Sequence, residues 1–140
     1  MDGTFVVDCS VAAKWLLPEP GRAAAMELYR RHARGEVSLI APDLLLVEFA
    51  SLLAKQSGRN LITEPQAREA YRLLWQHGLR LVDTRPRLFR ALELALGQQL
   101  SLWDSVYVAV AVEYGCPVIT ADRRLFRSGK ARHSSLVLLA

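Results

Sequence analysis

Four acidic side chains occupy positions where a carboxylate is unusual. Asp8 ends the apolar run TFVVD, and Asp122 comes two residues after the apolar run PVIT. Asp104 opens a segment that is otherwise almost wholly apolar, and Glu48 lies in the middle of the run DLLLVEFASLL. Charges are rarely left in such surroundings without a partner or a metal ion. These four acids are therefore the candidate chemical groups of the chain.

The three aspartates also have a purely structural explanation as helix caps. Asp8 or Ser10 can cap the helix expected after them, and Asp122 can cap the helical turn RRLF. The sequence SLWD has the pattern of a capping box, in which Ser101 caps the helix and Asp104 returns the bond. Taken alone, each aspartate leaves the structural and the chemical explanation open.

Glu48 is harder to explain by local structure. Its neighbours one helical turn away are Leu44, Leu45 and Leu52, and only Ser51 on that face is polar. An unpaired, ionised glutamate on an apolar face would cost several kcal/mol. Glu48 is therefore either at the edge of the face, reaching water, or held near a cation.

Considered together, the four acids favour a metal site. Clustered carboxylates repel one another and their pKa values rise unless a positive charge lies among them. Mg²⁺ supplies that charge, prefers oxygen ligands and keeps several waters. Such a site suits phosphodiester hydrolysis, because the metal lowers the pKa of a bound water and screens the phosphate charge. One metal ion and two are both compatible with the sequence.

Other common kinds of site lack support. His32, His77 and His133 share no ligand spacing, which disfavours zinc. The nucleotide-binding patterns GxxxxGK[ST] and GxGxxG are absent, and so is the GxSxG pattern of a serine nucleophile.

The elements that must position the acids alternate between strand and helix. We expect strands at residues 4–8, 37–41, 79–83, 117–122 and 135–140, and helices at 10–17, 20–35, 42–58, 63–78, 86–97, 101–115 and, briefly, 123–126. This order predicts one α/β domain over residues 1–140, with a central, mostly parallel sheet and helices on both faces. Ligands bind outside the carboxyl ends of strands in such sheets, where Asp8 and Asp122 are expected.

Composition adds weaker constraints. A net charge of +4 and a pI near 9.4 favour polyanionic partners such as nucleic acid. No apolar run reaches the ~18 residues of a membrane span, and the first residues do not resemble a secretory signal. Cys9 and Cys116 belong to no CxxC motif, and we expect both to be reduced, in a cytoplasmic protein with no membrane contact.

The chain resembles the PIN domain family, and within it the VapC-type toxins of toxin–antitoxin pairs. The resemblance lies in four motifs that follow one another along the chain, within VVDCSVAAKWLLPE, APDLLLVEFASLLAK and LSLWDSVYVAVAVEYGCPVITADRRLF. It implies an α/β/α sandwich with about five parallel strands and a ribonuclease that depends on Mg²⁺ or Mn²⁺. It also implies a homodimer that a small antitoxin protein inhibits.

The resemblance assigns roles to individual residues. The family's acidic, metal-binding and catalytic positions correspond to Asp8, Glu48, Asp104 and Asp122. Ser10 and Thr120 match hydroxyl residues that help to hold ligands or waters. Many relatives carry Asn three residues after the helix glutamate, and this chain carries Ser51, which can form a hydrogen bond but reaches less far.

Basic residues crowd two segments that we expect near the acids. One segment follows Asp122 and contains Arg123, Arg124, Arg127, Lys130, Arg132 and His133, and the other contains Arg85, Arg87 and Arg90. An RNA backbone would need such cations, because an acidic pocket repels phosphate. A solvated surface is the alternative. Trp103, beside Asp104, is the best candidate to stack on a base, although most tryptophans at helical spacing are core or interface residues.

The expected function is a metal-dependent endoribonuclease, the toxin of a toxin–antitoxin pair, in which a metal-activated water cleaves RNA. Two alternatives remain at this stage. The first is a PIN-like module that is catalytically silent and acts through protein contacts. The second is a metal-dependent phosphohydrolase acting on small phosphate esters.

Overall fold

A computed structural model describes residues 3–98, 100–129 and 136–139. The strands are β1 (Gly3–Val7), β2 (Val37–Pro42), β3 (Arg80–Val82), β4 (Val118–Thr120) and β5 (Leu136–Leu138). The helices are α1 (Cys9–Leu16), α2 (Arg22–Ala33), α3 (Leu44–Gly58), α4 (Glu64–Gln76), α5 (Leu88–Gln98), α6 (Leu102–Tyr114) and α7 (Arg123–Gly129), with a 3-10 turn, η1 (Arg85–Arg87), before α5. The predicted order of strands and helices is confirmed. The basic residues Lys130, Arg132 and His133 lie outside the described residues.

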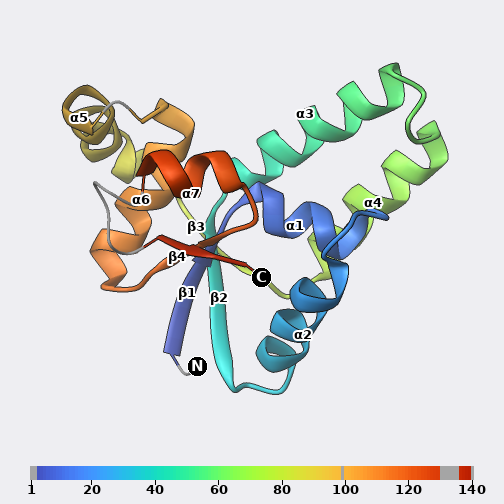
Figure 1. The fold of residues 1–140 in the computed structure, drawn as a ribbon, viewed down its shortest axis with the longest axis horizontal. Helices are drawn as coiled ribbons and strands as arrows, with labels where there is room; N and C mark the ends of the chain where they lie inside the picture. Colours follow the sequence, from blue (N-terminus) through green and yellow to red (C-terminus); the bar gives the residue numbers. More distant parts are fainter. Residues whose placement is uncertain (1–2, 99, 130–135, 140) are drawn as a thin grey trace.

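The sheet has five strands in the order β3-β2-β1-β4-β5, and every pair is parallel (Figure 1). The central strand β1 pairs with β2 through Val6 and Ile40, and with β4 through Val6 and Val118. Because all strands run the same way, their carboxyl ends form one edge of the sheet. After β1 the chain continues to β2, on one side of β1, whereas after α6 it continues to β4, on the other side. The junction between β1 and β4 is therefore the switch point, where ligands bind in such folds.

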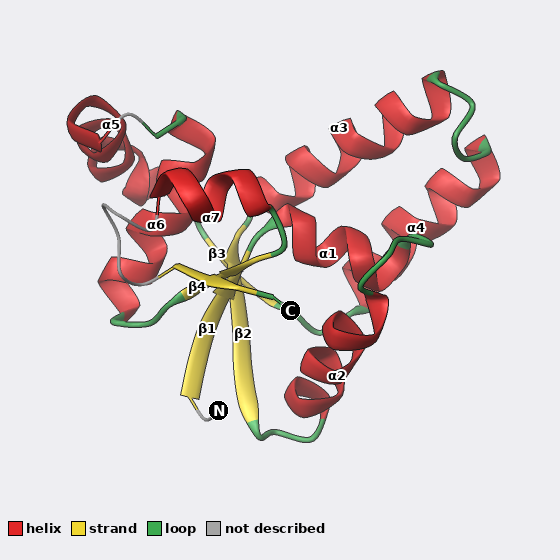
Figure 2. Ribbon diagram, viewed as in Figure 1, coloured by secondary structure: helices red, strands yellow, loops and turns green. Residues whose placement is uncertain are grey.

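Helices cover both faces of the sheet, as predicted. Figure 2 shows α5 and α6 on one side of the strands and α1, α2 and α4 on the other. α6 packs directly on β1, β2 and β4, while α1 contacts β4 and α2 contacts β2. Strand β1 is apolar at Phe5, Val6 and Val7 because it is covered on both faces.

The apolar run of α6 explains how one helix can support a polar edge. Every residue from Ser105 to Ala111 is buried, so the helix is apolar almost all round. One side of it joins the main core around the sheet, and the other joins a smaller cluster with α5 and α7. This burial fixes the position of the first turn of α6, which carries Asp104.

Helices α3 and α4 form a long hairpin that extends away from the sheet (Figure 1). Thr63 caps α4 in a reciprocal capping box with Gln66. Cys9 and Cys116 are free thiols, Cys116 buried and Cys9 half-buried, as the sequence predicts for reduced cysteines. Among the described residues, no helix combines the length and apolar character needed to cross a membrane.

Candidate active site at the carboxyl edge of the sheet

Asp8 follows β1 directly and caps α1. Its Oδ1 accepts hydrogen bonds from the backbone N–H groups of Ser10 (3.1 Å) and Val11 (3.3 Å) and from the Ser10 hydroxyl (2.5 Å). Only 8% of the residue is exposed. Burial raises the pKa of Asp8 from 3.8 to about 6, although its hydrogen bonds oppose the shift. Asp8 is therefore both a helix cap and a carboxylate that has no ion-pair partner among the residues the structure describes.

Ser10 and Thr120 lie together behind Asp8. The Ser10 hydroxyl, besides its bond to Asp8, accepts a hydrogen bond from the backbone N–H of Ala121 at 2.8 Å. Thr120 Oγ1 is 3.3 Å from Ser10 Oγ and accepts a bond from the N–H of Asp122 at 3.0 Å. These bonds tie the end of β1 to the end of β4, and with them Asp8 to Asp122.

Asp122 caps α7 in the way the sequence suggests. Its Oδ1 accepts hydrogen bonds from the N–H groups of Arg124 (2.9 Å) and Leu125 (3.1 Å). These bonds hold the Asp122 side chain against the first turn of α7.

Asp104 lies in the first turn of α6 and is half-buried. Ser101 caps the helix by accepting the Asp104 N–H at 3.0 Å, but among the described residues the return bond of the predicted capping box is not formed. Burial and the charge of Asp122 raise the pKa of Asp104, while the Ser101 hydroxyl and Arg124 oppose the rise. The side chain is thus not required for capping.

Glu48 is half-buried on α3 and has a partner that the sequence analysis missed. The Tyr107 hydroxyl, buried on α6, donates a hydrogen bond to Glu48 Oε1 at 2.6 Å. Burial and the charge of Asp104 raise the pKa of Glu48, and the bond from Tyr107 lowers it. One signal could have identified Tyr107: it lies one helical turn after Asp104 and carries a polar atom in an apolar run.

The four acids share one electrostatic environment, with Asp104 at its centre. Burial is the largest cause of the raised pKa values of Asp8, Glu48 and Asp104. The charge of Asp104 adds to the rise at Asp8 and Glu48, and the charge of Asp122 adds to the rise at Asp104. Like charges raise one another's pKa only when they are close and poorly screened. The edge therefore gathers the four acids that the sequence analysis selected.

The donor chemistry of this edge fits a hard divalent cation. All four side chains offer carboxylate oxygens, which Mg²⁺ and Mn²⁺ prefer, and a cation among them would offset the burial, and the smaller like-charge repulsion, that raise the pKa values of Asp8, Glu48 and Asp104. In the described part of the chain, no group of three or more His, Cys, Asp or Glu side chains is placed to hold a metal ion.

The start of α3 is held by a contact between two strand ends. The Thr84 hydroxyl, after β3, donates to Asp43 Oδ1 at 2.6 Å and accepts the N–H of Leu44 at 3.0 Å. The Thr84 N–H also donates to Asp43 Oδ1, at 3.0 Å. These bonds fix the first turn of α3, which presents Glu48 one turn later, and no local pattern in the sequence indicates them.

The predicted RNA-contacting arginines differ in their surroundings. Arg123, Arg124 and Arg127 are exposed on α7, which begins immediately after Asp122. Arg85 is exposed in η1, whereas Arg87 is bound to Glu113, with its Nε 2.9 Å from Glu113 Oε2. Arg87 is therefore a weaker candidate for an RNA contact, since its guanidinium already has a carboxylate partner. Ser51 is exposed on α3, one turn after Glu48.

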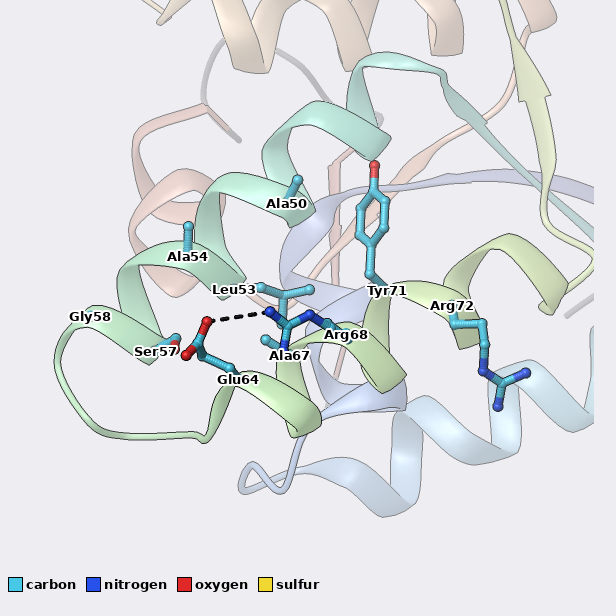
Figure 3. Close-up of a pocket in the computed structure, with 10 residues that line it drawn as sticks. All are labelled: Ala50, Leu53, Ala54, Ser57, Gly58, Glu64, Ala67, Arg68, Tyr71 and Arg72. Carbon is cyan, nitrogen blue, oxygen red and sulfur yellow. Dashed lines mark hydrogen bonds and ion pairs between the residues drawn. The ribbon is translucent and has the colours of Figure 1, made fainter.

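A separate cavity of about 710 Å³ lies between α3 and α4 (Figure 3). It is lined by small side chains such as Ala50, Ala54 and Ala67, and the ion pair between Glu64 and Arg68 spans part of it. None of the four acids lines it, so this cavity is not the candidate active site.

A known protein family matches most of the chain, including the residues of the acidic edge. The PIN domain family model matches residues 5–131, a span that contains all four acids. The chain belongs to the PIN domain family. The PIN domain match also covers the strands and helices that place these acids, from β1 to α7.

Individual relatives support a distant homology to VapC proteins. The PIN domain is 31% identical to "Ribonuclease VapC3" of Pyrobaculum aerophilum over 123 residues, which cover 86% of this chain and 91% of the relative. The crystal structure of PAE2754 from Pyrobaculum aerophilum superposes with a TM-score of 0.72 at 19% identity, over 99% of this chain and 92% of that one. VapBC2 from Rickettsia felis, solved bound to a DNA fragment from the promoter, gives a TM-score of 0.70 at 13% identity, over 96% of each chain. The last two matches establish the shared fold.

Proposed function

We propose that this PIN domain is a metal-dependent endoribonuclease that hydrolyses RNA phosphodiester bonds. The observation that carries the proposal is that Asp8 after β1, Asp104 in the first turn of α6 and Glu48, bonded to Tyr107 of the same helix, are buried or half-buried carboxylates, with burial as the main cause of their raised pKa values. Keeping buried, neighbouring carboxylates ionised costs free energy, which a bound cation offsets. An oxygen-rich site for a divalent cation also suits the hydrolysis of a phosphodiester. The 31% identity to a ribonuclease supports the same reaction.

In this proposal each residue has a defined task. The four acids hold Mg²⁺ or Mn²⁺, which when bound supplies positive charge and a water of lowered pKa. Ser10 and Thr120 keep Asp8 fixed between β1 and β4, and Tyr107 keeps the Glu48 carboxylate oriented toward the same edge. Mutation of residues that form hydrogen bonds to metal-binding side chains typically lowers metal affinity or activity by about 10–100-fold.

The basic helix α7 would hold the RNA. Arg123 and Arg127 are exposed on the helix that starts at the acidic edge, so their charges lie beside the acids. RNA phosphates approaching an acidic pocket need neighbouring cations, and each phosphate contact adds to the salt dependence of binding.

We propose further that the protein is the toxin of a toxin–antitoxin pair and forms a homodimer. The similarity to a protein named VapC3 and to the VapBC2 structure supports the pairing with a small antitoxin. Exposed apolar side chains on α5 support an association with other protein chains: Phe89 and Leu96 are each 77% exposed, and Leu92 is 48% exposed.

The deciding experiment measures RNA cleavage by the purified chain, freed of any co-purified protein. We expect cleavage of single-stranded RNA with Mg²⁺ or Mn²⁺, none with EDTA, and recovery when the metal is restored. Asp104→Asn, which keeps the backbone N–H that Ser101 accepts, should be inactive while retaining its circular dichroism spectrum.

Two outcomes would contradict the proposal. Absence of metal-stimulated cleavage of all RNAs tested, in a sample shown to lack antitoxin, would leave a module that acts through protein contacts. Preference for a chromogenic phosphomonoester over RNA would indicate a phosphohydrolase of small esters.

A further inference from the structure

A groove of about 390 Å³ opens beside Glu48, between α3 and the first turn of α6. It is lined by Val47, Glu48, Ser51, Leu52, Lys55 and Trp103. The volume is in the range of small-ligand sites. Because Glu48 forms part of both the groove and the acidic edge, a molecule in the groove would lie next to the site of cleavage.

Trp103 offers this groove an open aromatic face. Trp103 is 54% exposed and immediately precedes Asp104, which is half-buried. Unpaired RNA bases stack on exposed aromatic rings, whatever their sequence, because every base has a flat π face.

Lys55 offers the groove a positive charge. It follows Glu48 by two turns of α3, about 10 Å along the helix axis. Lys55 is exposed and forms no ion pair with another residue in the described ranges. A cation that is not neutralised by the protein suits a phosphate group, and a compact ammonium is a common phosphate partner.

We propose that this groove binds one unpaired nucleotide of the RNA substrate, beside the scissile phosphate, with Trp103 stacked on the base and Lys55 paired with a phosphate. The proposal rests on the proposed ribonuclease function and adds that the enzyme requires single-stranded RNA at this position. In a duplex the base would be stacked within the helix and could not reach Trp103.

The chemistry of the groove favours RNA over a second protein chain. Glu48 and Lys55 are ionisable, and such residues are depleted at the centre of protein interfaces. The exposed apolar residues Phe89, Leu92 and Leu96 lie on α5 and do not line the groove. A protein partner therefore has a more suitable surface elsewhere on the molecule.

The test measures binding of a fluorescent ten-nucleotide single-stranded RNA to the full chain by anisotropy, in EDTA so that no cleavage occurs. Trp103→Leu should raise the Kd about 5- to 100-fold, which corresponds to the loss of one stacked base. Trp103→Phe should recover most of the affinity, because a phenyl ring still stacks. Trp75→Leu is the matched control, since Trp75 is 64% exposed on α4 and distant in sequence from the groove residues, and it should leave the Kd unchanged.

Two further measurements separate stacking from charge. Lys55→Ala should reduce the slope of log affinity against log salt concentration by about 0.7, the value for one phosphate contact on a single strand. Trp103→Leu should leave that slope unchanged. With a duplex RNA of the same length, Trp103→Leu should bind as the parent does.

Equal affinities of Trp103→Leu and Trp75→Leu for single-stranded RNA would overturn the groove proposal. So would a change of Trp103→Leu from dimer to monomer in size-exclusion chromatography with the Kd per protomer unaltered, which would assign the groove to a protein interface. The proposed function is judged separately. If Trp103→Leu loses affinity for single-stranded RNA but the parent protein cleaves no RNA, the groove proposal is supported and the nuclease proposal is contradicted. If the parent shows metal-dependent cleavage but Trp103→Leu keeps its affinity, the nuclease proposal is supported and the groove proposal is contradicted.

Discussion

Ser10 Oγ and Thr120 Oγ1 lie 3.3 Å apart although 110 positions separate the two residues in the sequence. Their contact joins the carboxyl ends of β1 and β4, where the parallel sheet changes direction of winding. Asp8 lies two residues before Ser10, and Asp122 lies two residues after Thr120. The contact between the two hydroxyl groups therefore sets the distance between two of the proposed metal-binding acids.

Replacing Ser10 by Ala should destabilise the protein by about 1–3 kcal/mol, because the Ala121 N–H and Asp8 Oδ1 both lose a partner. The pKa of Asp8 should also rise further above about 6, since the Ser10 bond lowers it. Urea denaturation of the metal-free protein measures the first effect. Ser10→Thr, which keeps the hydroxyl, is the control, and an Ala variant within about 0.5 kcal/mol of the parent would show that the contact is dispensable.

Replacing Asp8 by Asn should reduce metal-dependent cleavage by more than about 100-fold and should stabilise the metal-free protein at neutral pH. Since the folded pKa, about 6, lies above the ordinary 3.8, the contribution of Asp8 to the stability of the parent is fully present below pH 3.8 and is lost as the pH rises through 6. Asn carries no charge, so at pH 7 the gain is on the order of 3 kcal/mol. Denaturation curves at pH 4.5 and pH 7, recorded for both proteins without metal, measure it. A variant that retains full activity would remove Asp8 from the site.

Replacing Tyr107 by Phe should lower cleavage and Mn²⁺ affinity by about 10–100-fold, because Glu48 loses the bond that orients its carboxylate. Calorimetric titration with Mn²⁺ measures the affinity independently of activity. Tyr114→Phe is the matched control, since Tyr114 lies on the same helix and its ring faces Arg80 rather than the acids. Equal Mn²⁺ affinities of the two variants would mean that Tyr107 serves packing alone.

Replacing His77 by Phe should make the protein less sensitive to mild acid. The His77 ring is stacked on Trp15, with ring centroids 4.2 Å apart, and is tilted against Tyr29, with centroids 4.0 Å apart. Within the described residues both of its buried nitrogens lack a hydrogen-bond partner. Burial and the nearby His32 lower its pKa from 6.5 to about 4. Stability from the neutral ring is therefore present above pH 6.5 and is lost as the pH falls toward 4.

The measurement is the free energy of unfolding against pH between 4 and 6.5. The slope for His77→Phe should be lower than that of the parent by at most ~1.4 kcal/mol per pH unit, the value for one proton. Comparison with the parent is essential, because Asp8 contributes with the opposite sign over the same range. Parallel curves for the two proteins would show that His77 is protonated as easily in the folded chain as in the unfolded one.

Local patterns were sufficient to predict the elements and which acids stand at their ends. Apolar runs and alternation predict the strands, and capping chemistry places Asp8, Ser101 and Asp122 at the helix starts where the structure has them. The observed helix boundaries differ from the expected ones where the local backbone conformation is incompatible with a helix. The helix expected from residue 20 begins at Arg22, because Gly21 has φ +81°, in the left-handed region that a helix cannot include.

Contacts between distant segments could not be predicted from these patterns. The Tyr107–Glu48 bond joins residues 59 positions apart, and the Ala121–Ser10 bond spans 111. Periodicity reports which face of one element is buried, but it carries no information on which side chain of another element will meet that face. The Arg87–Glu113 pair, 26 positions apart, likewise depends on the packing of α6 beside η1, which no local pattern indicates.

The double role of two acids changes how the sequences of distant relatives should be interpreted. Asp8 and Asp122 cap α1 and α7, so a descendant that had lost nuclease activity would still be under selection to keep a capping side chain, such as Asp, Asn or Ser, at both positions. Glu48 lies in the middle of α3 and caps no helix, and its half-buried charge costs stability unless a cation is present. An inactive descendant would be free to replace it with Gln or Leu. The residue at position 48 is therefore the more sensitive marker of retained catalysis.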